Sequence, residues 1–243
     1  MSGITERGNA QDSTGAGVVK SAELQEHMPA PSFTFGFECM GPREQDRSRY
    51  VYLRDMIAGL VQRSLLRRLI DWLLGRGMGE LLAAFRAEIA AIQLERKWAE
   101  SIRNTVMTGG KNDLLDKYFA GSSYTAAWYV LPISSVSYSA IAAGDTMSSH
   151  AGWTEAGPTN APNYSQSTRV ALAFSAASSG SKATSAASAL SITATGTIKG
   201  AAVVSNSTKD GTTGILYSAA LFTGGDKVVA SGDTLNITGS WSV

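Results

Sequence analysis

The side chains that could do chemistry in this chain gather in one stretch, 144–155, which reads GDTMSSHAGWTE. Its candidates are Asp145, Ser148, Ser149, His150 and Glu155. A hydrolase triad needs a nucleophile on a strained turn and a base that a third group holds, and G-x-S-x-G or a comparable context is missing. A metal site is also disfavoured, because Asp145, His150 and Glu155 recur every five residues and share neither a helix face nor one side of a strand. The stretch therefore predicts no catalytic residue and no metal ligand.

A structural role explains the same stretch. We expect a long ordered loop in which Asp145 and Ser148 cap turns, His150 bonds to backbone groups, and Trp153 packs on the sheet domain. A glycan-degrading enzyme would need two carboxylates across a cleft. After Lys117 the chain has only five acidic residues, of which Asp145 and Glu155 are the candidate pair. We therefore expect a protein that is not an enzyme.

Cofactor and nucleic-acid signals are also missing. The glycines of Gly75–Gly79 are not followed by Lys-Ser or Lys-Thr, as a phosphate loop requires, and the third is misplaced for a dinucleotide fingerprint. The single cysteine, Cys39, excludes an intramolecular disulfide and a Cys-based zinc site, so we expect a small buried side chain. A net charge of +1 gives no field that would attract nucleic acid. We expect no cofactor, metal or nucleic acid.

Charge divides the chain into two blocks. Through Lys117 there are 16 basic and 15 acidic residues, whereas the remaining 126 of the 243 residues contain five of each. The first block is typical of charged helices, and the second, rich in Ser, Thr, Ala and Gly, of short strands joined by tight turns. The first residues lack the apolar core of a signal peptide, and no run approaches the roughly 20 apolar residues of a membrane span. We therefore expect a protein that is made and kept in a cytoplasm, unless it leaves by cell lysis as part of a particle.

The first block predicts an arm followed by a helical hairpin. Residues 1–49 are expected to form an extended arm with a short strand at Phe33–Phe37, where aromatic and small residues alternate. Residues 50–108 are expected to form two helices, Tyr50–Leu74 and Glu80–Met107. Arginines interrupt the apolar face of the first helix, and we favour packing against another helix over binding to a membrane surface. The hairpin has more apolar surface than two helices can bury, which indicates oligomerisation.

Residues 109–243 predict an antiparallel β-sandwich. Gly109-Gly110 marks the boundary, and Asn112 or Asp113 can cap a short helix that ends at Gly121. Strands are expected at Ser123–Ile133, Ser165–Phe174, Ala189–Lys199, Ala201–Asn206, Ile215–Phe222, Lys227–Ala230 and Thr234–Val243. Glycine-containing turns such as Lys209–Gly214 separate the last of them. The predicted class is α+β, an N-terminal arm and helical hairpin followed by a β-sandwich, and we expect the part from about Gly109 to fold alone.

Aromatic residues of the second block raise the possibility of a sugar-binding surface. They are Tyr124, Trp128, Tyr129, Tyr138, Trp153, Tyr164, Tyr217 and Trp241. Large rings dominate burial in thin domains, so we expect most of them in the core or at an interface. A glycan remains the alternative partner for those that are exposed.

Three stretches of the second block are distinctive as whole phrases. They are NDLLDKYFAGSSYTAAWYV, AAGDTMSSHAGWTEAGPTNAPNYSQSTR and GTIKGAAVVSNSTKDGTTGILYSAALFTGGDKVVASGDTLNIT. Together they resemble a family of small structural proteins of tailed bacteriophages, of the fibre or decoration type. The resemblance covers about residues 108–243 and is most specific at GDTMSSHAGWTE with the Tyr164 and Arg169 segment after it, whereas the helical first block departs from the family.

This resemblance implies a virion structural protein, located in the particle and assembled in the host cytoplasm. We expect a fibre subunit of the tail or head-tail region whose first block anchors and oligomerises it, as a dimer or trimer, and whose β-domain is exposed. Its expected partners are further copies of itself, other virion proteins and a host-surface glycan. One alternative is a capsid decoration protein that stabilises the shell, and a second, less favoured, is a glycan-degrading tail enzyme.

Overall fold

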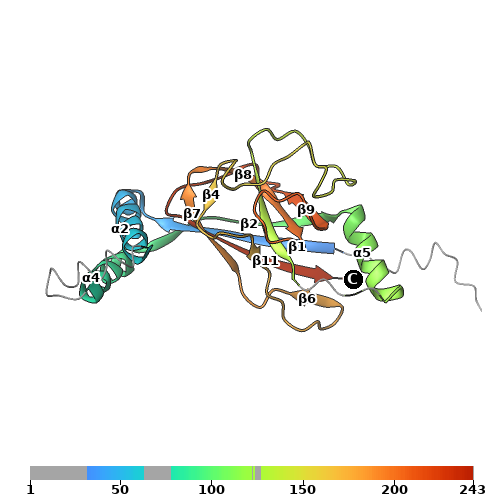
Figure 1. Ribbon diagram of the computed structural model, residues 1–243, viewed down its shortest axis with the longest axis horizontal. Coiled ribbons are helices and arrows are strands. Elements are labelled where there is room, and N and C mark those ends of the chain that lie inside the picture. The colour runs from blue at the N-terminus through green and yellow to red at the C-terminus, as the bar shows by residue number, and fades with distance from the viewer. Residues whose placement is uncertain (1–31, 63–77, 122, 124–126, 243) are drawn as a thin grey trace, which may run out of the picture.

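The computed structural model describes residues 32–62, 78–121, 123 and 127–242. Within these residues, eleven strands form one antiparallel sheet that curls into a half-barrel, and three helices lie outside it (Figure 1). The α+β class is therefore confirmed, but the sheet is a single curled one and not clearly a sandwich. The expected arm over 1–31 and the end of the first expected helix, 63–74, lie outside the described residues.

The order of the strands unites the two blocks of the chain. The helices are α2 (Glu44–Gln62), α4 (Met78–Ala91) and α5 (Thr108–Phe119). The strands are β1 (Ser32–Pro42), β2 (Leu94–Val106), β3 (Tyr129–Ser134), β4 (Asn163–Tyr164), β5 (Val170–Ala171), β6 (Ser181–Ala183), β7 (Ser188–Ala194), β8 (Gly196–Val204), β9 (Leu216–Leu221), β10 (Lys227–Val229) and β11 (Thr234–Ser242). Neighbours follow the order β4-β7-β11-β1-β2-β9-β8-β3-β5, with β6 beside β11 and β10 beside β8. Two strands of the first block thus lie in the middle of the sheet, between strands of the second, and the division at 49 and 108 into separate folding units stays a prediction.

Strand β1 confirms the pattern of alternating residues. Phe33, Phe35, Phe37 and Cys39 share one face of the strand and are all buried. The strand is longer than expected because it pairs with β11 along one edge and with β2 along the other. Burial of the single cysteine is likewise confirmed.

The expected helix Glu80–Met107 is wrong beyond its first half. Helix α4 ends at Ala91, and the chain continues as strand β2, which pairs with β1. On β2, Ile102, Asn104 and Val106 are buried in alternation with exposed neighbours. The spacing of Trp98 and Ile102 fits either element, since residues four apart share a face of a helix and also one side of a strand. The spacing of the apolar residues therefore could not distinguish a helix from a strand in this segment.

Helices α2 and α4 form an insertion at the tip of the β1–β2 hairpin. Pro42 and Leu94 are the last paired positions, so the chain leaves the sheet at one and returns at the other. The two helices contact each other, with an ion pair between Arg49 and Glu88. Figure 1 shows them at one end of the elongated molecule, with α5 at the opposite end. None of the described helices is long and apolar enough to span a membrane.

A buried carboxylate fastens α2 to the sheet. Asp233 Oδ1 lies 3.0 Å from Arg47 Nη1 on α2 and 2.9 Å from Lys97 Nζ on β2, and Oδ2 accepts a hydrogen bond from the Ala230 amide at 2.9 Å. Cys39 Sγ on β1 lies 3.6 Å from the same carboxylate. Burial, and then the charge of Asp233, raise the pKa of the Cys39 thiol. One side chain thus connects the helical insertion to the two strands that carry it.

Helix α5 begins earlier than the capping residues indicated. It starts at Thr108, so Gly109 and Gly110 lie in its first turn. Gly110 is required there because a Cβ would lie 2.9 Å from the Cα of Tyr217 on β9 and still closer to its carbonyl oxygen. The expected end is confirmed: the C-cap is Ala120, and Gly121 follows with a φ of +68°.

The strands expected in the second block are confirmed in part. Strands β9, β10 and β11 match their expected ranges closely. The break expected at Gly200 lies instead at Thr195, between β7 and β8, and Gly200 is buried within β8. The range Ser165–Phe174 contributes only the two-residue strand β5, and β3 begins at Tyr129. In the rest of that range, Phe174 forms only an isolated bridge with Thr184, and Leu172 donates a single backbone hydrogen bond to Trp128.

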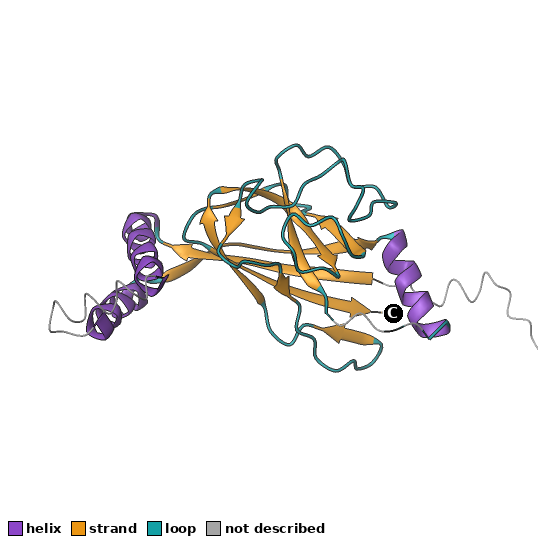
Figure 2. Ribbon diagram, in the orientation of Figure 1, coloured by secondary structure: helices purple, strands orange, loops and turns teal. Residues whose placement is uncertain are grey.

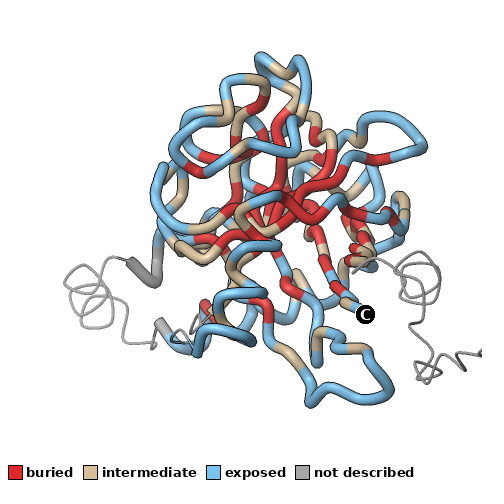
Figure 3. The backbone as a smooth tube through the Cα atoms, turned by 90° about the vertical axis from the view of Figure 1, so that its right-hand side faces the viewer, coloured by how far each residue is buried: buried red, intermediate tan, exposed pale blue. Residues whose placement is uncertain are grey.

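The core has two parts, one on each side of the curled sheet. The larger cluster lies inside the curl and includes Phe33, Phe35, Leu190, Ile198 and Ile237. The smaller one includes Met147 and Trp153 of the long 135–162 loop (Figure 2) together with residues of β3, β8 and β9. Figure 3 shows the buried residues concentrated in the middle of the molecule, with exposed segments around them. The 135–162 loop therefore covers the sheet as a second layer would.

Candidate functional site

The stretch 144–155 lies in the loop that covers the smaller core cluster. Trp153 is buried there, and its indole Nε1 donates a hydrogen bond to Asp145 Oδ2 at 2.9 Å. The same oxygen accepts a hydrogen bond from the Ala142 amide at 2.9 Å. The expectations that Asp145 closes a turn and that Trp153 packs on the sheet are thus confirmed. Asp145 therefore accepts two hydrogen bonds that hold the loop in shape.

His150 is also held by the loop itself. Its Nδ1 lies 3.1 Å from the carbonyl oxygen of Trp153, and the two rings are stacked with centroids 4.1 Å apart. This confirms the expected bond to a backbone group. Ser148 bonds to the hydroxyl of Thr146 at 3.2 Å and does not cap a turn as expected. No hydrogen bond among the described residues joins His150 to Asp145, Ser148 or Ser149, so the geometry does not assemble a triad.

Glu155 forms a buried ion pair with Arg169 that the sequence did not suggest. Arg169 Nη2 lies 2.7 Å from Glu155 Oε2, and Nε lies 3.0 Å from Oε1. The exposed fractions of the two side chains are 0% for Arg169 and 4% for Glu155. Burial raises the pKa of the Glu155 carboxyl, while the Arg169 guanidinium opposes that shift because it stabilises the charged form. Fourteen residues separate the pair along the chain, and no periodicity connects them.

The Glu155–Arg169 pair positions the turn around Asp210. The Asp210 amide donates to Glu155 Oε2 at 2.9 Å, and Arg169 donates to the carbonyl oxygens of Asn206 and Gly211 at 2.9 and 3.0 Å. Asp210 has a φ of 54°, in the left-handed region that Asp tolerates better than most residues. Its backbone is therefore fixed by buried groups while its side chain stays at the surface.

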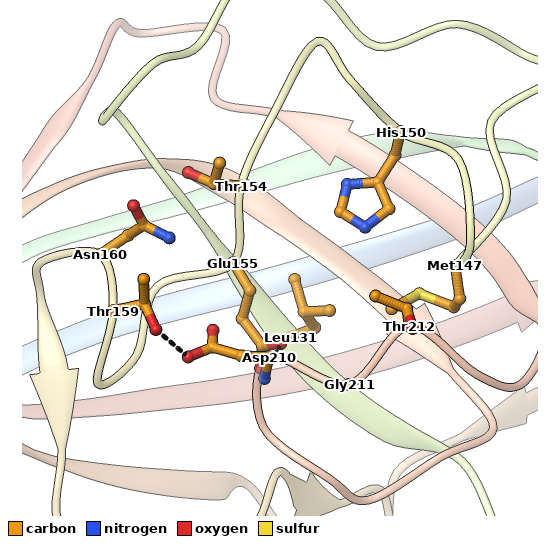
Figure 4. A pocket seen from close by; sticks show the side chains of 10 residues that line it. All are labelled: Leu131, Met147, His150, Thr154, Glu155, Thr159, Asn160, Asp210, Gly211 and Thr212. Carbon is orange, nitrogen blue, oxygen red and sulfur yellow. Dashed lines mark hydrogen bonds between the residues drawn. The ribbon is translucent and has the colours of Figure 1, made fainter.

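A cavity of about 160 Å³ opens between this turn and the 135–162 loop. Its polar lining includes His150, Thr154, Thr159, Asn160 and Asp210, and Leu131 and Met147 also line it (Figure 4). Thr159 Oγ1 donates to Asp210 Oδ2 at 2.7 Å, which joins the two walls. Sequence reasoning missed Thr159, Asn160 and Asp210 as site residues. The turn signal at 209–214 marked only the presence of a loop.

The other candidate sites are structural in the described part of the chain. No group of three His, Cys, Asp or Glu residues that could hold a metal ion occurs among the described residues. The aromatic side chains of the second block that the structure describes do not form an exposed platform: Trp153 and Tyr164 are buried, and Trp128, Tyr129, Tyr138, Tyr217 and Trp241 are half-buried against the two clusters. Tyr124 lies outside the described residues. The expectation that most of these rings belong to the core is confirmed.

Helix α5 carries the most prominent exposed apolar surface of the described residues. Tyr118 and Phe119 are 79% and 78% exposed, and their rings contact each other edge to face with centroids 4.9 Å apart. Leu114 and Leu115 of the same helix are 42% and 52% exposed. Exposed apolar patches of this kind often mark interaction sites.

Comparisons of the chain with protein-family models and with curated proteins found no match.

Proposed function

We propose that this chain is a structural protein of a bacteriophage virion and, within that class, a fibre subunit. It would attach to the particle through its N-terminal block and expose the β-domain. The observation that carries the proposal is the insertion of α2 and α4 at the tip of the long β1–β2 hairpin, away from α5 (Figure 1). The helical end exposes Tyr52, Leu81 and Leu94, and the other end exposes the aromatic residues of α5. An elongated subunit with apolar surface at both ends suits repeated assembly, where many weak contacts act together.

The 144–155 stretch gives a second, independent argument that the chain is a structural protein. The residues that could have done chemistry, Asp145, His150 and Glu155, are engaged in bonds that hold the covering loop and the Asp210 turn. These residues lie in the phrase that resembles the phage proteins most specifically. The resemblance therefore rests on residues that stabilise the fold. We propose further that the covering loop and the curled sheet together act as the two layers of a sandwich-like body.

The first test asks whether the chain is present in virus particles. Particles purified by density gradient are analysed by mass spectrometry and by labelling with an antibody against the β-domain. A fibre subunit is expected at a fixed copy number at the tail or the head-tail junction, and particles without it should stay intact but adsorb poorly. Uniform labelling of the shell, with normal adsorption and a heat-sensitive shell in its absence, would favour decoration. Absence of the chain from particles would overturn the proposal.

The second test places assembly in the helical insertion. Mass photometry of the full chain is compared with a variant in which residues 43–93 are replaced by Asn-Gly, which shortens the β1–β2 hairpin to a two-residue turn. A dimer or trimer that becomes monomeric in the variant supports anchoring through α2 and α4. An oligomer that persists in the variant would assign assembly to another surface, and α5 would be the next to alter.

A further inference from the structure

The cavity beside Asp210 offers hydrogen-bonding atoms that the fold does not use. Asp210 Oδ2 accepts from Thr159, but among the described residues no hydrogen bond to Oδ1 is formed. The side-chain amide of Asn160 likewise has no partner among the described residues and lies at the cavity wall (Figure 4). Asp210 is exposed and Asn160 is half-buried, so a ligand from solvent can reach both. The cavity therefore presents an acceptor and an amide on its lining.

His150 adds a second acceptor. A carbonyl oxygen can only accept, so the bond to Trp153 requires the proton on Nδ1. In the neutral ring this leaves Nε2 with a free lone pair. Figure 4 shows the ring projecting from the 135–162 loop toward the cavity. Stacking on Trp153 fixes its orientation.

The walls of the cavity are held in place before any ligand binds. Hydrogen bonds between the backbone of the Asp210 turn and the buried side chains of Glu155 and Arg169 fix that turn. The hydrogen bond from Thr159 joins it to the opposite wall of the cavity. Preorganised groups bind more tightly because less conformational freedom is lost.

We propose that this cavity binds one neutral sugar residue of a glycan. At about 160 Å³ it far exceeds the roughly 10–15 Å³ that one water needs, and it is smaller than the roughly 300 Å³ of pockets for drug-sized molecules. Sugar hydroxyls can donate to Asp210 Oδ1 and His150 Nε2 and accept from the Asn160 amide. An anionic ligand is disfavoured, since Asp210 is negative and the charge of buried Arg169 is already matched by Glu155. A single exposed carboxylate is too little for a metal ion.

This inference deepens the proposed function, on which it rests only for the source of the ligand, a glycan at a host surface. The sugar contact itself is a property of the isolated chain. Sugar binding can therefore be absent even if the chain is found in virus particles, and it can be present even if the chain is not found there.

The test is saturation-transfer NMR on the full chain with the methyl glycosides of glucose, galactose, mannose and N-acetylglucosamine. We expect at least one to bind with a Kd on the order of 1 mM, which is usual for a ligand of this size. Asp210→Asn should weaken that binding about five- to tenfold, because the charged acceptor becomes a neutral amide oxygen, which accepts a weaker hydrogen bond, while Asn tolerates the left-handed backbone. Asp226→Asn, which alters another exposed turn carboxylate, is the matched control and should bind as the original chain does.

A second variant keeps the test decisive if Asp210→Asn unfolds. Thr159→Val removes the hydroxyl that orients Asp210 and preserves the shape of an exposed side chain, and we expect about three- to tenfold weaker binding. Absence of saturation transfer from all four glycosides, or equal transfer to the chain and to both cavity variants, would overturn the proposal.

Discussion

Arg169 lies fully buried against Glu155 and donates to both oxygens of its carboxylate, with Nη2 2.7 Å from Oε2 and Nε 3.0 Å from Oε1. Its remaining donors reach the carbonyl oxygens of Asn206 and Gly211. One guanidinium therefore joins the end of the covering loop to the turn that carries Asp210.

Loss of this guanidinium should be costly. Arg169→Met would leave Glu155 buried without its partner, and breaking a buried ion pair in this way costs about 3–5 kcal/mol of unfolding free energy. Urea denaturation measures the loss. Arg96→Met is the control, because Arg96 lies 3.8 Å from Glu38 with both side chains largely exposed, and its cost should stay below about 1 kcal/mol. Equal effects of the two substitutions would show that the buried pair has no special role.

Glu100 should make stability depend on acid pH. Burial alone would raise the pKa of Glu100, but hydrogen bonds from Lys227, Gly224 and Thr223 outweigh it and lower the pKa to about 2. A carboxyl whose pKa is lowered by folding stabilises the folded state above its ordinary pKa of 4.5, and this contribution is lost as pH falls toward 2.

The comparison of Glu100→Gln with the original chain isolates this effect. Thermal melting should show the variant less stable at pH 6, with a difference that narrows between about pH 4.5 and 2. Asp226→Asn removes a more exposed carboxylate, 2.9 Å from Lys199, and should show a much smaller difference. A constant difference across that range for Glu100→Gln would contradict the assigned bonds.

The first turn of α5 should tolerate no side chain at Gly110. In Gly110→Ala the new Cβ would collide with the backbone of Tyr217, so the helix must move away from β9, at a cost of about 1–3 kcal/mol. Gly59 on α2 has open space, with nothing within 4 Å of the position that a Cβ would take, and Gly59→Ala should stabilise the chain by about 0.5–1 kcal/mol through the lower entropy of its unfolded state. Chemical denaturation of both variants checks the opposite signs. A neutral result for Gly110→Ala would mean that α5 does not pack on β9 as described.

The sheet order leads us to expect that the part from Gly109 does not fold alone. It would lack β1 and β2, which lie between β11 and β9, and so expose the edges of both strands and the core inside the curl. The variant with 43–93 replaced by Asn-Gly keeps both strands and should fold. Circular dichroism and cooperative thermal melting compare them. Cooperative melting of the Gly109 fragment as a monomer would instead support the independent β-domain that the charge pattern predicts.

Patterns in the sequence predicted the structure correctly where that structure depends on residues near one another along the chain. The alternating phenylalanines of β1, the helical start of the insertion, the glycine after α5 and the turns between β9, β10 and β11 follow from side-chain periodicity and backbone preference. Asp145, His150 and Trp153 bond to one another or to backbone within one loop, which is why their structural role could be predicted.

Tertiary structure decided what depends on residues distant in the chain. Strand β2 carries Glu100 and Asn104 on positions that a strand pattern would fill with apolar residues, and their partners lie more than 100 residues away: Lys227 pairs with Glu100, and Ser218 accepts a hydrogen bond from Asn104 Nδ2. Asn104 Oδ1 is buried with no partner among the described residues. The Glu155–Arg169 pair and the cavity beside Asp210 likewise exist only because the curled sheet brings three loops together. Periodicity records which face of an element is buried, but it does not record which distant element buries it. The fold class was therefore readable from the sequence, whereas the pairing of the sheet and the shape of the site were not.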